Sequence, residues 1–302
     1  LLDNYKIYQM NNKIFVLGAT GFQGANIASQ LLAKGSEVTT LKRSLKDGAP
    51  AMPGIKVTEG GLENVDALKN ALNGVDAAVY TFPLIFDINL AKAYTSNFIT
   101  AAKEQGVPLI IYNAGFDLPK ESSELLALNL KVEIKSLFDA SGLNVITLVP
   151  DIYIDNISAP WSIPVVLNNN IVPYPIAAGS KIPWISHVDL AKYVVAAISK
   201  PELVGEVLPI GGNLLTGEEI AAAISSEINQ PINFVPMTPN EFEQQIVPAF
   251  GDLAGKEISN IYRYVEDNRV GLTSKNFKRT QDILGVVPQS LTEWVKSVKW
   301  EL

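Results

Sequence analysis

The sequence predicts an α/β protein built on a doubly wound parallel sheet, with a smaller, mostly C-terminal α/β lobe. Short apolar runs alternate with helical segments from residue 13 to about residue 150, and beyond Pro150 this alternation breaks and prolines crowd. Strands that alternate with helices return to one sheet through right-handed crossovers, which place helices on both faces. We expect the sheet domain at 13–150, a lobe at 151–302 interleaved with it, and an extension at 1–12.

Each expected strand is a short apolar run bounded by turn residues. The strands are expected at Ile14–Gly18, Glu37–Leu41, Ile55–Thr58, Ala77–Tyr80, Leu109–Tyr112 and Asn144–Val149. An apolar stripe from Ala25 to Leu32 predicts the first helix, which Gly35 closes. Further helices are expected at about 64–72, 87–105 and 121–141, each followed by a glycine suited to a C-cap.

The expected lobe contains helix starts with clear capping signals. Thr216, Thr238 and Ser290 each precede a glutamate by three residues, the spacing of a capping box. Ser186 or His187 opens another helix that runs to Ser199. We interpret His187, the single histidine, as a residue of this helix start rather than as a catalytic group.

A glycine-rich turn follows the first expected strand and opens the first helix. It consists of Gly18, Ala19, Thr20, Gly21, Phe22, Gln23 and Gly24. One such glycine permits a tight turn, another lets the backbone approach a pyrophosphate, and the helix start offers free N–H groups to phosphates. The Gly-x-x-Gly-x-x-Gly spacing is associated with the short-chain dehydrogenase branch of nucleotide-binding folds. The sequence therefore predicts an NAD(P)-binding Rossmann fold.

The end of the second expected strand indicates which dinucleotide binds. An acid about 20 residues beyond the last glycine would bind the ribose of NAD, whereas an arginine accommodates the 2′-phosphate of NADP. Here the strand ends in Lys42-Arg43-Ser44, with no acid. We predict NADP(H), with Arg43 stacking on the adenine or pairing with the phosphate and with Ser44 and Lys46 nearby. The alternative is that Arg43 is a solvated turn residue.

Composition excludes several classes of function. The 302 residues contain no cysteine and one histidine, which rules out thiolate chemistry and makes metal sites improbable, so we expect none. The net charge of −7 offers no basic footprint for nucleic acid. No apolar run reaches the roughly 18 residues of a membrane span. We expect a cytoplasmic protein whose partner is a small-molecule substrate or a regulatory protein, with no direct contact to nucleic acid or membrane.

Motifs along nearly the whole chain resemble the NmrA-like family of atypical short-chain dehydrogenase/reductases, related to isoflavone and phenylcoumaran benzylic ether reductases. These motifs are VLGATGFQG at 16–24, KRS at 42–44, EGGLENVDALKNAL at 59–72, NLKVEIKSLFDASGLNVITLVPDIYIDN at 129–156 and ISHVDLAKYVVAAI at 185–198. At Gly60-Gly61-Leu62 the chain departs from relatives that carry an acid before the leucine, which puts an adenine contact there in doubt.

The resemblance implies roles for residues that follow the expected strands. Thr20, Phe22 and Gln23 would wrap the pyrophosphate, and Thr81 and Phe82 would border the adenosine or nicotinamide ribose. Tyr153, Ile154, Asp155 and Asn156 would line the nicotinamide end. All of these follow carboxyl ends of strands, where open α/β sheets bind ligands.

The usual proton donor of short-chain dehydrogenases is missing, because no tyrosine is followed by a lysine four residues later. In the ether-reductase relatives a lysine on the helix before the sixth strand does the acid–base work, and Lys131 resembles it. Lys131 is therefore a candidate for catalysis or cofactor orientation, against the alternative of a solvated helix face shared with Lys135. Tyr153 and Asp151, directly after the sixth strand, are further candidate proton donors.

Aromatic and apolar residues near these strand ends suit the wall of a substrate pocket, although each alone fits core packing equally well. The candidates are Phe82, Pro83, Phe86, Phe116, Tyr153, Trp161 and Trp184. Two functions agree with the sequence. The first is an NADPH-dependent reductase of a small apolar or aromatic carbonyl, quinone, enone or benzylic ether. The second is a non-catalytic NADP(H) sensor that acts through a protein partner.

Overall fold

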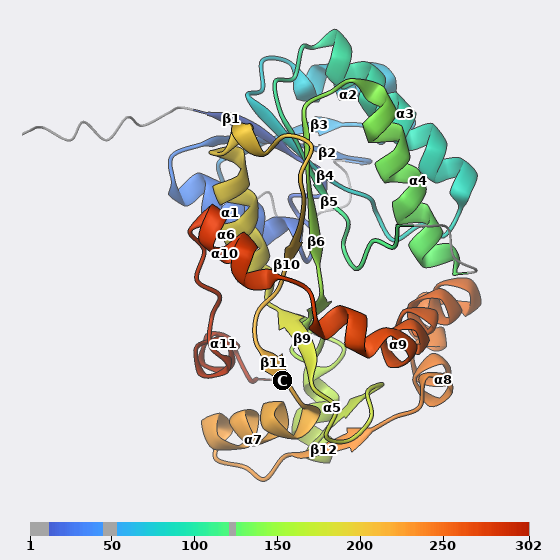
Figure 1. Cartoon of the computed structure of the whole chain (residues 1–302), viewed down its shortest axis with the longest axis vertical. Coiled ribbons are helices and arrows are strands. Elements are labelled where there is room, and N and C mark those ends of the chain that lie inside the picture. Colours follow the sequence, from blue (N-terminus) through green and yellow to red (C-terminus); the bar gives the residue numbers. More distant parts are fainter. Residues whose placement is uncertain (1–11, 45–52, 121–124, 302) are drawn as a thin grey trace, which may run out of the picture.

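A seven-stranded parallel sheet forms the centre of the molecule (Figure 1). The computed structural model describes residues 12–44, 53–120 and 125–301. The sheet order is β10-β6-β5-β4-β1-β2-β3, and every neighbouring pair is parallel. The strands are β1 (Lys13–Val16), β2 (Glu37–Lys42), β3 (Ile55–Glu59), β4 (Ala77–Thr81), β5 (Ile110–Asn113), β6 (Val145–Pro150) and β10 (Val207–Ile210). This is the predicted doubly wound sheet.

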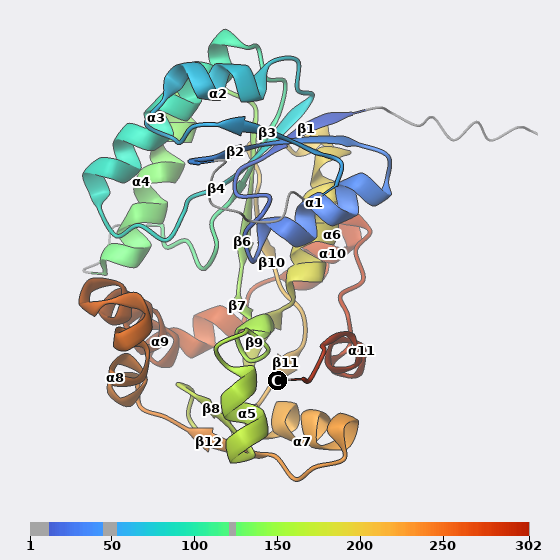
Figure 2. The same ribbon diagram turned by 180° about the vertical axis from the view of Figure 1, so that it is seen from behind.

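Helices cover both faces of the sheet, and each face has its own apolar core. One face carries α1 (Gly24–Ala33), α6 (His187–Ile198) and α10 (Phe277–Leu284). The other carries α2 (Val65–Leu72), α3 (Ile88–Glu104) and α4 (Leu126–Ser141). Figure 2 shows α2, α3 and α4 together on the side away from α1 and α6. Because apolar side chains pack on both faces, the central strands are buried along their length.

The first six strands lie where the sequence predicts them, with ends that shift by one or two residues. The first strand ends at Val16 and not at Gly18, because Leu17 and Gly18 already belong to the turn. The helix expected from 121 begins at Leu126, and residues 121–124 lie outside the described part of the chain. The seventh strand, β10, was not predicted. It is short, contains Pro209 and pairs only with β6 at the sheet edge, where proline is tolerated.

A lobe with its own core lies beyond the carboxyl ends of the strands. Its strands are β7 (Ile152–Tyr153), β9 (Ile182–Ile185), β11 (Leu214–Leu215), β8 (Ile171–Tyr174) and β12 (Asn233–Pro236). Its helices are α5 (Ile163–Asn169), α7 (Gly217–Ile228), α8 (Pro239–Phe250), α9 (Asp252–Thr273) and α11 (Leu291–Ser297), with short 3-10 turns η1 (Ile154–Asn156) and η2 (Pro201–Leu203). Helices α8 and α9 pack against each other, and α9 also contacts α4, below which the pair lies in Figure 1.

The capping signals predict the starts of α7, α8, α11 and α6 correctly. Thr216, Thr238 and Ser290 each form a complete capping box with the glutamate three residues later. The Ser186 side chain caps α6 by accepting a hydrogen bond from the Asp189 N–H. Each such cap stabilises its helix by roughly 1 kcal/mol.

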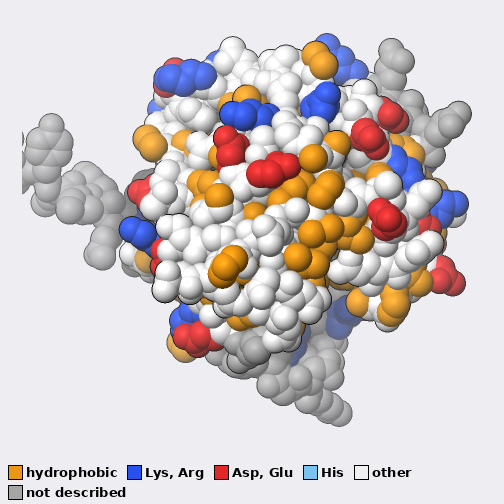
Figure 3. Space-filling model, turned by 90° about the horizontal axis from the view of Figure 1, so that it is seen from below, with side chains coloured by type: hydrophobic (Ala, Val, Ile, Leu, Met, Phe, Trp, Pro, Cys, Tyr) orange, Lys and Arg blue, Asp and Glu red, His pale blue; other side chains and the backbone are white. Residues whose placement is uncertain are grey.

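On the face seen in Figure 3, lysines and arginines lie scattered among acidic side chains, and apolar side chains gather near the middle. Within the described ranges, none of the helices has both the length and the apolar character required to cross a bilayer.

Candidate functional site

The glycine-rich turn between β1 and α1 is compact and held by its own backbone. Gly18 has a φ of +73°, and the Gly21 N–H donates to its carbonyl at 2.8 Å. A Cβ on Gly24 would lie 2.2 Å from the Gly18 oxygen, so this position admits no side chain without movement of the turn. Thr20, Gly21 and Phe22 are exposed around the start of α1, whereas Ala19 is buried. The turn therefore presents an exposed, glycine-lined backbone at a helix N-terminus.

Two buried polar residues that the sequence analysis missed fix this turn. The Thr40 hydroxyl donates to the Val16 carbonyl at 2.7 Å, beneath the turn. The Asn113 amide, at the end of β5, donates to Gln23 Oε1 at 3.3 Å and to Thr81 Oγ1 at 3.2 Å. Asn113 thus joins the ends of β4 and β5 to the glycine turn. The sequence does carry a signal for Asn113, because it directly follows the predicted strand Leu109–Tyr112, at the edge of the sheet where ligands bind.

Arg43 follows β2 directly and its side chain is exposed. Within the described ranges it makes no hydrogen bond or ion pair, so the guanidinium is available to a ligand. Ser44 is half-buried next to it. Lys46 lies outside the described residues.

A cavity of about 340 Å³ opens where the sheet meets the lobe. The segments that follow β1, β4, β5 and β6 contribute Gln23, Leu84, Gly115 and Asp151 to its lining. The lobe supplies most of the remaining wall. Of the residues predicted for cofactor or substrate, those that line it are Gln23, Phe116, Tyr153, Asn156 and Trp161. The cavity therefore lies at the carboxyl edge of the sheet, beside the glycine turn.

Other predicted pocket residues lie elsewhere. Phe82 and Phe86 pack against the core under α2, α3 and α4, and Leu84, 60% exposed, borders the cavity instead of its neighbour Pro83. Trp184 is buried in the lobe core, and its indole N–H donates to the Leu215 carbonyl.

The other predicted residues after β6 are tied into the protein. Ile154 is buried in the lobe core. The Asp155 carboxylate accepts a hydrogen bond from the His187 backbone N–H at 2.8 Å. The Asn156 amide donates to the Tyr174 hydroxyl at 3.4 Å.

The buried ring of His187 lies between Phe22 of the glycine turn, which is exposed, and Tyr153 of the cavity wall. The ring of His187 lies 4.5 Å from Phe22, edge to face, and 4.7 Å from Tyr153. Neither His187 Nε2 nor the Tyr153 hydroxyl has a hydrogen-bond partner among the described residues. Burial lowers the pKa of His187 to about 4 and raises the pKa of Tyr153 well above its ordinary value. Both side chains are therefore neutral at neutral pH.

Lys131 lies behind the cavity wall formed by the β5 end. Its Nζ donates to the Ala114 carbonyl at 2.8 Å, and a Cβ on Gly115 would lie 3.6 Å from Nζ. Burial lowers the pKa of Lys131 to about 8, and nearby Asp117 opposes this shift. Lys131 does not itself line the cavity. By contrast, Lys135, one turn later, pairs with Asp139 on the helix.

A buried charge cluster underlies the same wall. Lys275 Nζ pairs with Asp117 at 2.9 Å and with Asp151 at 2.8 Å, and the Tyr264 hydroxyl donates to Asp117. Asp151 is 1% exposed, and its Oδ2 has no hydrogen-bond partner among the described residues. Burial raises the pKa of Asp151 to about 7 although Lys275 opposes the shift. Lys275 thus joins the α9–α10 connection to the ends of β5 and β6.

Metal binding finds no support in the part of the chain that the structure describes. It contains no group of three or more histidine, aspartate or glutamate side chains arranged to hold an ion.

These features occur in a fold shared with known proteins. The model of the NmrA-like family matches residues 10–295. The chain belongs to the NmrA-like family. The NAD(P)H azoreductase of Xenophilus azovorans is 27% identical over 236 residues, which cover 76% of this chain and 79% of the azoreductase.

Solved structures resemble the NmrA-like chain over almost its whole length. The triphenylmethane reductase of a Citrobacter species, solved with NADP(H), has a TM-score of 0.75 at 19% identity and covers 95% of this chain and 100% of its own. NmrA, a negative transcriptional regulator, has a TM-score of 0.74 at 17% identity, covering 97% of this chain and 100% of its own. At these identities the likeness establishes the Rossmann-like fold.

Proposed function

We propose that this NmrA-like protein is an NADPH-dependent reductase of a small apolar or aromatic molecule, such as a carbonyl compound, quinone, enone or benzylic ether. The observation that carries the proposal is the cavity beside the glycine turn, with Gln23 belonging to both. An electron acceptor in this cavity would lie next to a dinucleotide that binds across the end of the sheet. The azoreductase relative supports the same class of chemistry.

The turn and its surroundings fit NADP(H). Gly24 keeps the backbone free of side-chain atoms at the start of α1, where helix N–H groups favour phosphate. Arg43 offers an exposed cation after β2, as the 2′-phosphate of NADP requires. When bound, NADPH supplies a hydride. The protein residues have to hold the acceptor, exclude water and supply a proton.

The proposed proton source is the pair Lys131 and Tyr153. Tyr153 lines the cavity and keeps its proton at neutral pH, because burial raises its pKa, so its hydroxyl can donate a hydrogen bond to an acceptor there. Lys131, with a pKa of about 8, carries a proton at neutral pH and exchanges it readily. Its Nζ lies close to Gly115, which lines the cavity.

NADPH oxidation against a panel of quinones, enones, aldehydes and aryl ethers tests the proposal. The wild type should turn over at least one of these classes, with kcat/KM falling above a pH of about 8 as Lys131 loses its proton. Lys131→Met and Tyr153→Phe should each lower kcat by about a hundredfold or more. Lys135→Met is the matched control on the same helix and should keep wild-type rates, because Lys135 pairs with Asp139.

The alternative is a dinucleotide-responsive regulator that acts through a protein partner, as the likeness to NmrA suggests. In that case no compound of the panel is turned over, while the protein binds one redox form of the dinucleotide more tightly than the other. That pair of results would overturn the reductase proposal.

A further inference from the structure

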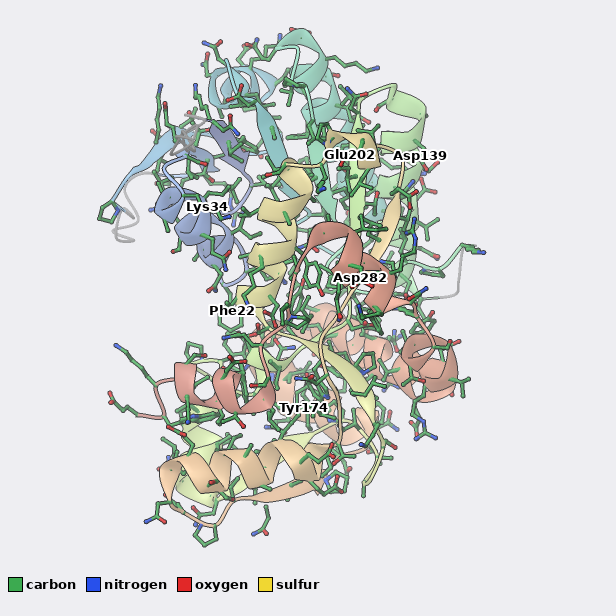
Figure 4. All side chains as sticks on the ribbon, turned by 60° about the vertical axis from the view of Figure 1, so that its left-hand side comes forward. Phe22, Lys34, Asp139, Tyr174, Glu202 and Asp282 are labelled. Atoms are coloured by element: carbon green, nitrogen blue, oxygen red, sulfur yellow. The ribbon has the colours of Figure 1, made fainter. Side chains whose placement is uncertain are left out.

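Three polar side chains form a hydrogen-bonded group in the cavity wall, apart from the other polar residues that line it, which are Gln23, Asp151, Tyr153, Ser162 and Gln245. The three side chains are Asn156 from η1, Tyr174 from β8 and Tyr262 from α9, and all three line the cavity. The two phenol oxygens are 2.7 Å apart, and the Asn156 amide donates to the Tyr174 hydroxyl at 3.4 Å. Tyr174 and Tyr262 are 4% and 6% exposed. Figure 4 shows Tyr174 within the lobe, well apart from Phe22 of the glycine turn. We call these residues the polar triad.

Aromatic packing holds both phenols in place. The rings of Tyr174 and Tyr262 are perpendicular at 5.4 Å, and Phe242 packs against Tyr262 at 5.1 Å. Trp184 packs against the other side of Tyr174 at 5.2 Å. Since neither ring can swing away without breaking these contacts, the two hydroxyls stay together at the cavity wall.

Counting protons in the polar triad leaves one without an acceptor. Two phenols carry two O–H protons, and the bond between them uses only one, whichever phenol donates. Asn156 presents its N–H₂ group to Tyr174, so it supplies a further donor and no acceptor. Among the described residues, no other acceptor is bonded to either phenol. A buried donor of this kind is normally satisfied.

We propose that the polar triad is a binding subsite for a hydrogen-bond acceptor on the end of the substrate remote from the glycine turn. The substrate class is an aromatic molecule that bears an ether, carbonyl or quinone oxygen at that end. One phenol donates its spare proton to this oxygen, and the apolar residues of the wall contact the rings. Calling the ligand a substrate rests on the proposed function, whereas its binding does not.

A matched pair of unreactive ligands tests the subsite without any turnover. The β-methoxy and β-ethyl derivatives of naphthalene have nearly the same shape, but only the methoxy compound carries an acceptor oxygen. Their dissociation constants would be measured by calorimetry for the wild type, both single variants Tyr174→Phe and Tyr262→Phe, and the double variant. Tyr80→Phe is the matched control, because Tyr80 is a buried phenol bonded to Thr95 in a different core.

The wild type should bind the methoxy compound about threefold to tenfold more tightly than the ethyl compound, the usual range for one neutral hydrogen bond. Each single variant should keep this preference, because the phenol that remains still has a proton without an acceptor. The double variant should lose it, and Tyr80→Phe should retain it. Circular dichroism would verify that each variant is folded.

Three results would overturn the inference. One is a double variant that keeps the preference, and another is that neither compound binds. The third is a wild type without preference, expected if Asn156 turned its amide oxygen toward the phenols and accepted the spare proton. Because these are binding measurements, an inactive protein that shows the predicted pattern would contradict the reductase proposal and leave the subsite standing.

Discussion

Arg43 is the residue on which the choice of dinucleotide depends. It is exposed directly after β2, and no acid stands there to bind a ribose. We predict that Arg43→Glu weakens NADPH binding by roughly tenfold to a hundredfold, the range of a hydrogen bond to a charged group, and improves NADH binding relative to it. Dissociation constants of both cofactors from fluorescence titration give the measurement.

Lys34→Glu provides the matched control for charge. Lys34 is also exposed, but it lies at the opposite end of α1 from the glycine turn, as Figure 4 shows. Its reversal changes the net charge equally and should leave the ratio of the two dissociation constants unchanged. Equal losses in both variants would mean that Arg43 acts only through the general field of the protein.

Among single residues, the sequence predicts those whose role is set by their neighbours along the chain. The glycine turn is such a case, because strand, turn and helix are contiguous. The polar triad is not, since Asn156, Tyr174 and Tyr262 meet only after β8 and α9 fold against η1. Phe82 and Phe86 illustrate the same limit, because their aromatic character fits the core as well as a pocket.

At the scale of the elements, the N-terminus of α4 is stabilised by a side chain from α9, a helix far away in the sequence. Its N-cap, Leu125, has no side-chain oxygen to bond the first free N–H groups. Instead Glu257 of α9 accepts a hydrogen bond from the Ala127 N–H at 3.1 Å, and it is 6% exposed. A carboxylate at a helix N-terminus also interacts favourably with the helix dipole. Glu257 therefore ties α9 to the helix that carries Lys131.

We predict that Glu257→Gln lowers the free energy of unfolding by about 1 kcal/mol, because the charge at the α4 N-terminus is lost. Urea denaturation would measure this, and amide hydrogen exchange of Ala127 should become faster. Glu266→Gln, an exposed position on the same helix, should change neither quantity. If both variants had wild-type stability, the α9 contact would contribute nothing to the start of α4.

Elements could be predicted where their signals are local. Alternating apolar runs placed six strands correctly, and the three capping boxes placed the starts of α7, α8 and α11, because each signal lies within the element it predicts. Helices α5 and α9, whose N-caps make no side-chain hydrogen bond, were not predicted. Strand β10 was missed, since Val207–Ile210 contains Pro209, and a proline within a short apolar run argues against a strand. Its pairing with β6 depends on chain that returns from the lobe.

At the scale of the whole molecule, the stability of the fold depends on pH through two buried groups, Asp151 and His187, whose pKa values shift in opposite directions. Burial raises the pKa of Asp151 to about 7 from its usual 3.8, so the folded state binds a proton that the unfolded state releases. This contribution makes stability fall as the pH rises from about 4 to 7. Burial lowers the pKa of His187 to about 4 from 6.5, so its contribution makes stability rise between these values. The two contributions partly cancel in the wild type.

Substituting each residue in turn should separate the contributions of Asp151 and His187 to the pH dependence of stability. Compared with the wild type, Asp151→Asn should gain stability as the pH rises from about 4 to 7, and His187→Leu should lose it, each by roughly 2–4 kcal/mol. Asp155, whose pKa burial raises to about 6, is present in all three proteins and cancels in the differences. Urea denaturation at several pH values measures the curves. A loss of packing lowers the free energy of unfolding by the same amount at every pH, so it does not change the slope. Only opposite slopes of the two differences from the wild type, plotted against pH, support the assignment. Parallel curves would mean that folding leaves both groups solvated.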